Sequence, residues 1–115
     1  AVGIDVKGAG RRSRGDGNYD TRGRWMELRN VKGNRGSLFG TAKYMVVATP
    51  QGWAWVRRDE LMIECVLRHI EGTWLTKWRG QSYIIHVPFT YLLRTARMVW
   101  ACPFLDSQYA DDSKT

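Results

Sequence analysis

Glu27 and Arg29 stand two residues apart in the strand-like residues 24–31 and are the first candidates for chemistry. Strand side chains alternate between the two faces of a sheet, so a strand here would place both groups on one face. A carboxylate can hold a divalent cation, and a neighbouring cation can stabilise negative charge on an attacked phosphate. The pair therefore fits metal-dependent phosphodiester hydrolysis. It also fits an ordinary solvated face of an edge strand.

Length and charge narrow the classes of function. The chain has 115 residues and a hydrophobic content of 43%, which suits one folded domain with a single core. Its net charge of +7 favours a polyanion as partner, with nucleic acid ahead of a membrane surface. A charged surface without a partner is the plain alternative. We expect no membrane span and no signal peptide. The expectation of an intracellular protein rests on the two cysteines, Cys65 and Cys102, which are expected to be reduced.

The hydrophobic pattern predicts strands and helices in turn. Strands are expected at residues 2–9, 24–31, 42–49, 53–57, 82–87 and 98–105, and helices at residues 58–70 and 88–97. This order predicts an α+β (α/β-like) fold with a mixed central β-sheet flanked by helices. Residues 1–105 would form the domain, and residues 106–115 a polar tail. Residues 11–23 and 32–36 are rich in Gly and Arg and are expected to be loops.

Cations gather in and beside these two loops, where their side chains can grip phosphates. The candidates are Arg11, Arg12, Arg14, Arg22, Lys32 and Arg35. Solvated loops without a partner are the alternative.

The two cysteines and the two histidines are weaker candidates for a catalytic or metal-binding site. Cys65 and Cys102 lack metal-type spacing and lie among apolar residues, so we expect reduced core thiols. His69 fits the end of a helix and His86 the polar face of a strand, so neither is a first candidate for catalysis or metal binding.

Three segments in order carry a family resemblance. They are residues 4–8 (Ile-Asp-Val-Lys-Gly), 24–33 (Arg-Trp-Met-Glu-Leu-Arg-Asn-Val-Lys-Gly) and 42–49, with Gly-Ser-Leu-Phe-Gly at 36–40. Together they resemble the PD-(D/E)XK nuclease superfamily, especially its compact phage-type and Holliday-junction-resolvase-like members. In these proteins an Asp ends one strand, and the next strand carries Glu-x-Lys. The resemblance covers about half of the chain and implies a restriction-endonuclease-like core.

The resemblance implies an active site for metal-dependent hydrolysis of DNA. Asp5 would be the first metal-binding carboxylate, Glu27 the second on the neighbouring strand, and the carbonyl of Leu28 a third ligand. The metal would be Mg²⁺ or Mn²⁺, which prefer oxygen ligands. Arg29 stands where the family has Lys, and Arg is a poor proton shuttle. Lys7 or Lys32 would then supply the missing amine, or hydrolysis would be weakened.

Several alternatives stay open. Asp5-Val6-Lys7 can itself be the D-x-K motif, with an earlier Asp upstream. The N-terminal helix of the family is absent from the sequence shown. The resemblance implies an endonuclease on duplex or branched DNA, in a bacterium or a phage-infected host cell, and a homodimer would let two sites face one duplex. The alternatives are a non-catalytic nucleic-acid-binding module that keeps this fold, and a small viral protein that inhibits a host protein.

Overall fold

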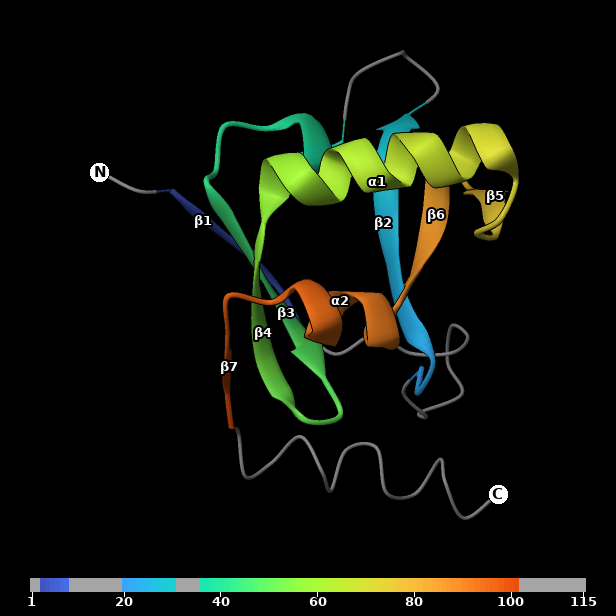
Figure 1. The fold of residues 1–115 in the computed structure, drawn as a ribbon. Coiled ribbons are helices and arrows are strands. Elements are labelled where there is room, and N and C mark those ends of the chain that lie inside the picture. Colours follow the sequence, from blue (N-terminus) through green and yellow to red (C-terminus); the bar gives the residue numbers. More distant parts are fainter. Residues whose placement is uncertain (1–2, 9–19, 31–35, 102–115) are drawn as a thin grey trace.

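The fold combines two α-helices with two β-sheets in the part of the chain that a computed structural model describes, residues 3–8, 20–30 and 36–101 (Figure 1). The elements are, in chain order, β1 (Ile4–Lys7), β2 (Gly23–Asn30), the 3-10 helix η1 (Ser37–Phe39), β3 (Tyr44–Thr49), β4 (Gly52–Arg57), α1 (Arg58–Glu71), β5 (Thr76–Arg79), β6 (Ser82–Pro88), α2 (Phe89–Thr95) and β7 (Met98–Trp100). The predicted α+β class is confirmed.

The first sheet is mixed and has the strand order β1-β3-β4-β7. β1 runs parallel to β3. β3 is antiparallel to β4, and β4 is antiparallel to β7. The strands predicted at residues 42–49 and 53–57 form the hairpin of β3 and β4. Its turn is closed by the Thr49 hydroxyl, which donates to the carbonyl of Gly52 at 2.8 Å. Gly52 has a φ of 137°, which a residue with a side chain rarely adopts.

The second sheet is antiparallel and has the strand order β2-β6-β5. The expectation of one central sheet is therefore wrong, because β2 pairs with β6 instead of β1 or β3. The sequence does not predict strand β5, since its residues Thr-Lys-Trp-Arg show no apolar alternation and most of them are exposed. β5 turns into β6 through Gly80, whose φ of 58° lies in the left-handed region.

Helix α1 ends where its sequence signals indicate. Asp59 and Glu60 occupy the first turn, where negative charge complements the helix dipole. Gly72 takes the left-handed conformation with a φ of 72°, and the N–H at this C-cap bonds to carbonyls of the last turn, which ends the helix. Leu61 and Cys65 are buried against both sheets, so the helix joins them into one core.

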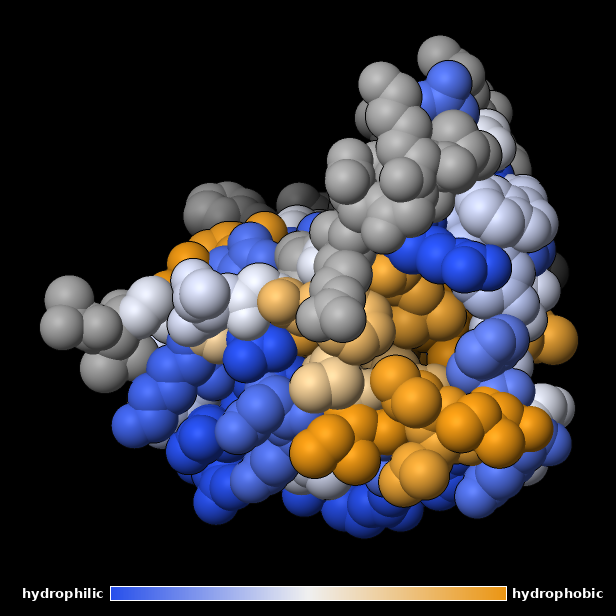
Figure 2. Space-filling view, turned by 90° about the horizontal axis from the view of Figure 1, so that it is seen from above, coloured by the Kyte–Doolittle hydropathy of each residue, from blue (hydrophilic) through white to orange (hydrophobic). Residues whose placement is uncertain are grey.

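One face of α1 differs from expectation. Helical spacing predicts that Ile70 shares the buried face of Leu61 and Cys65, but its side chain is 75% exposed. It lies with Ile63 and Leu67 at the spacing of one helical face, and all three are exposed. Figure 2, which looks down on α1, shows hydrophobic residues gathered in a patch on this side of the molecule.

Cys65 is confirmed as a free, buried thiol, and burial raises its pKa to about 12. Cys102 and the polar tail lie outside the described residues. No helix in the described ranges is long and apolar enough to cross a membrane.

Candidate nucleic-acid interface

The two carboxylates predicted to share a metal lie in different sheets. Asp5 is on β1, whose strand neighbour is β3, and Glu27 is on β2, whose neighbour is β6. The expectation that these residues occupy neighbouring strands is therefore wrong. Asp5 and Lys7 do share one face of β1, where both are half-buried, while Ile4 and Val6 are exposed on the other face.

Glu27 and Arg29 do not lie side by side. Glu27 pairs with Ile84 and Arg29 with Tyr83, so the register shifts and Leu28 is an extra residue in β2. Such a bulge reverses the alternation of side chains beyond it. The Glu27 carboxylate accepts a hydrogen bond from the Ser82 hydroxyl. The shared face expected for Glu27 and Arg29 is therefore wrong.

The donor set predicted for Mg²⁺ or Mn²⁺ is not brought together by strand pairing. The carbonyl of Leu28 accepts a hydrogen bond from the N–H of Gly36 at 3.1 Å, and Glu27 is bonded to Ser82. Within the described ranges, no three His, Cys, Asp or Glu side chains are grouped so that they could hold a metal ion. We derive no metal-dependent step from these residues, and metal binding stays a prediction.

Of the six cations predicted to hold phosphates, only Arg22 belongs to the described residues. It is exposed just before β2. The other five, Arg11, Arg12, Arg14, Lys32 and Arg35, lie outside the described residues.

A different group of cations lies on the second sheet, at its β5 edge. We call this surface the basic hairpin, and it consists of Trp25, Arg29, Lys77, Trp78 and Arg79. On one face, the Lys77 ammonium is 4.7 Å from the ring centre of Trp25, and the Arg79 guanidinium carbon is 5.7 Å from it. The sequence alone shows the β5 stretch only as apolar and basic.

The other face of the basic hairpin points toward α1. The Arg29 guanidinium carbon lies 5.9 Å from the ring centre of Trp78 and 5.8 Å from that of Tyr83. The Tyr83 ring in turn lies 5.4 Å from the ring of His69 on α1. Arg29, Lys77 and Arg79 are all exposed, and none of them forms an ion pair with a carboxylate of the described residues.

A hydrogen bond between His86 and Asp20, both of them largely buried, supports the Trp25 side of this surface. His86 Nε2 lies 2.8 Å from Oδ2 of Asp20, and each side chain is 14% exposed. Oδ1 of Asp20 accepts the N–H groups of Arg22 at 2.8 Å and Gly23 at 3.3 Å. The His86 ring packs 4.8 Å from the ring of Trp25. Asp20 is not among the residues predicted from the sequence, although an Asp shortly before a strand is a common turn signal.

Burial by itself would raise the pKa of Asp20, but the hydrogen bonds from His86 and the backbone outweigh it, and the pKa is lowered. The ionised Asp20 carboxylate therefore stabilises the folded protein. This stabilisation is fully present above the ordinary carboxyl pKa of about 3.9 and is lost as the pH falls through the lowered pKa of Asp20.

Replacing Asp20 by Ala is expected to lower the free energy of unfolding by about 2 kcal/mol at pH 7, because the backbone N–H groups and the His86 ring lose an acceptor that is only 14% exposed. The difference from the wild type should shrink as the pH falls below about 4. Urea unfolding at pH 7 and pH 3 measures both effects, with Asp20→Asn as the control that keeps Oδ1. An unchanged unfolding midpoint for Asp20→Ala at pH 7 would contradict this account of the hydrogen bonds of Asp20.

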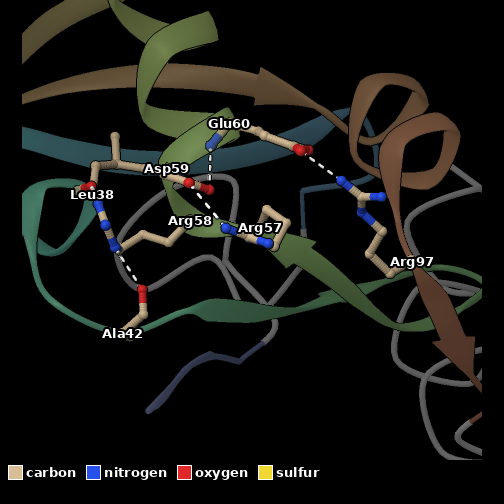
Figure 3. Close-up of polar contacts among 7 residues, drawn as sticks. All are labelled: Leu38, Ala42, Arg57, Arg58, Asp59, Glu60 and Arg97. Carbon is tan, nitrogen blue, oxygen red and sulfur yellow. Dashed lines mark hydrogen bonds and ion pairs between the residues drawn. The ribbon is translucent and has the colours of Figure 1, made fainter. Parts of the chain in front are cut away.

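Polar contacts at the start of α1 hold neighbouring segments of the chain against the helix (Figure 3). The Arg58 guanidinium donates to the carbonyls of Leu38 and Ala42, both at 2.6 Å, and so fastens η1 and the start of β3 to the helix. Two ion pairs lie nearby, Arg57 with Asp59 at 3.1 Å and Arg97 with Glu60 at 2.5 Å. Because these charges already have partners within the chain, we do not assign a binding site here.

A second, apolar surface lies on the first sheet. A groove of about 320 Å³ is lined by Ile4, Val6, Val46, Trp53, Trp55 and Trp100. Its lining carries no charged residue, so it does not suit phosphate. The apolar side chains of this groove suit the interface of a homodimer, and the homodimer stays a prediction from the sequence.

Comparison with models of known protein families found no match, and searches of curated proteins and of solved structures found no significant match. The resemblance to the nuclease superfamily therefore rests on the sequence segments alone.

Proposed function

We propose that this protein is a non-catalytic nucleic-acid-binding module that binds through the basic hairpin. The observation that carries this proposal is that Arg29, Lys77 and Arg79 are exposed, unpaired with described carboxylates and held against aromatic rings. The net charge of +7 supports attraction of a polyanion to this surface.

The ring contacts explain why these cations suit phosphate. A cation held over an aromatic ring loses side-chain freedom but keeps its full charge. Arg29 and Arg79 also keep planar guanidinium donors, which match the oxygen atoms of a phosphate. The entropy cost of ordering long side chains on binding is thereby reduced, and most of the electrostatic attraction is retained.

Salt dependence tests the proposal. Fluorescence anisotropy of a labelled oligonucleotide would give Kd for the wild-type protein at several KCl concentrations. Three phosphate contacts predict a slope of about −2 for log K against log salt on a single strand. A slope near zero, or no binding at low salt, would contradict nucleic-acid binding by this protein.

Metal-dependent hydrolysis of DNA in a restriction-endonuclease-like core is the second proposal. The observation that favours it is the common, half-buried face of Asp5 and Lys7 on β1. This placement agrees better with Asp5-Val6-Lys7 as the D-x-K motif than with a site shared by Asp5 and Glu27. Cleavage of labelled DNA with Mg²⁺, Mn²⁺ or EDTA, compared between wild type and Asp5→Asn, tests it.

A further inference from the structure

We infer that the basic hairpin binds a single-stranded nucleic acid, DNA or RNA, with one base stacked on Trp78. This inference rests on the proposed function of the same surface and adds the form of the nucleic acid. It starts from the indole of Trp78, which is 49% exposed on the edge strand β5. An exposed, immobilised aromatic ring is the usual platform for an unpaired base.

The surroundings of Trp78 hold the indole in place and leave 49% of the residue exposed. Its ring centre lies 5.1 Å from that of Tyr83, with the planes inclined by 50°. Arg29 lies near both rings. Trp25, by contrast, is less exposed and has Lys77, Arg79 and the ring of His86 against it. Trp78 is therefore the better platform of the two.

The position of β5 allows a nucleic-acid strand to contact both the cationic side chains and the indole of Trp78. Lys77 and Arg79 flank Trp78 in sequence and so point to the opposite face of β5. β5 pairs only with β6, which leaves its outer edge open among the described elements. A flexible nucleic-acid strand that passes over this edge of β5 can place its phosphates against Lys77 and Arg79 and one of its bases on the indole of Trp78.

A duplex does not fit this arrangement as well. Its bases are paired and stacked inside the helix, so Trp78 would reach a base only after it had flipped out. Flipping is energetically unfavourable, whereas a single strand already offers the faces of its bases. The same cations would still attract a duplex through its phosphates, but the contribution of Trp78 would be absent.

The experiment compares four labelled probes of equal length: oligo(dT), oligo(U), a DNA duplex and an abasic DNA strand. Kd is measured by anisotropy for the wild type and for Trp78→Leu. The matched control is Trp100→Leu, which removes an indole that is 54% exposed on the other sheet. Circular dichroism and thermal unfolding check that each variant is folded, and Trp78→Phe provides a second, more conservative variant.

The expected result is that the wild type binds oligo(dT) or oligo(U) more tightly than the duplex. Trp78→Leu should weaken binding of the better single strand about 10-fold and leave the abasic strand unchanged. Trp78→Phe should keep most of the affinity, and Trp100→Leu all of it. The preference between oligo(dT) and oligo(U) distinguishes DNA from RNA.

Two results would overturn the inference while the proposed function stands. One is salt-dependent binding of the duplex that equals or exceeds binding of both single strands. The other is an equal loss on the abasic strand and on oligo(dT) in Trp78→Leu. Absence of salt-dependent binding to all four probes would overturn the proposed function and the inference with it.

Discussion

Replacing Lys77 and Arg79 together by Glu is expected to lower the affinity for nucleic acid by at least about 100-fold at about 0.1 M salt. Each phosphate contact on a single strand contributes about 0.7 to the slope of log K against log salt. The double variant removes two such contacts and adds two charges that repel phosphate. The slope should therefore fall by more than about 1.4, in addition to the loss of affinity.

The fold should survive this double change. Both side chains are exposed, and neither forms an ion pair with a described carboxylate. Each gives up only its contact with the ring of Trp25, which contributes about 0.5–1 kcal/mol at an exposed site. Anisotropy titrations measure the affinity, and thermal unfolding measures the stability of the same samples.

A matched pair of single variants separates the hairpin from net charge. Arg79 and Arg94 are both exposed, and each guanidinium carbon lies 5.7 Å from an aromatic ring centre, Trp25 for Arg79 and Tyr91 for Arg94. Arg79→Glu should weaken binding, whereas Arg94→Glu on α2 should leave it nearly unchanged. Equal losses in the two variants would mean that total charge, and not the basic hairpin, determines the affinity.

Local signals in the sequence explain which elements could be predicted. The turn at residues 50–52 separates two apolar runs, and the β3–β4 hairpin follows from it. Gly72 ends α1 because it can adopt the left-handed conformation that closes the last turn. These features depend on a few neighbouring residues, and the structure confirms them.

The partners of the strands could not be predicted in the same way. Alternation shows which side chains share a face, but it does not show that β1 pairs with β3 or β2 with β6. The bulge at Leu28 also depends on a distant contact, since the carbonyl of Leu28 accepts the N–H of Gly36. This single extra residue separates Glu27 from Arg29 and changes the candidate site from a carboxylate–cation pair to an aromatic–cation surface.

The basic hairpin escapes prediction because its residues come from two separate segments. Residues 76–79 lack the alternation of a half-buried strand, and β5 exists because β6 supplies its hydrogen-bond partners. Only the pairing of β2, β6 and β5 brings Trp25 and Arg29 beside Lys77 and Arg79. The composition, with six Trp residues and a net charge of +7, indicates a stacking or polyanion-binding surface without locating it.

Replacing Gly36 by Ala is expected to destabilise the protein by about 3 kcal/mol. A Cβ atom at this position would lie 2.1 Å from the carbonyl oxygen of Glu27 and 2.7 Å from its carbonyl carbon. These are backbone atoms of a paired strand, so they cannot move aside as a side chain would. Overpacking of this kind costs about 1–3 kcal/mol and occasionally more, and the rigidity of β2 argues for the upper end.

The effect should spread because Gly36 links β2 to η1. Its N–H bonds to the carbonyl of Leu28, and its carbonyl accepts the N–H of Phe39 at 3.0 Å. These bonds hold Leu38, which is fully buried in the core between β2 and α1. Within the Gly-x-Leu-aromatic-Gly pattern, Gly36 is thus explained by close backbone approach and Leu38 by core packing.

Urea unfolding of Gly36→Ala against Gly8→Ala tests this account. At Gly8 an added Cβ atom would meet nothing within 4 Å, and its φ is not positive, so its substitution should change the free energy of unfolding by less than about 0.5 kcal/mol. If Gly36→Ala were as stable as the wild type, the close approach of Gly36 to the backbone of Glu27 would be wrong.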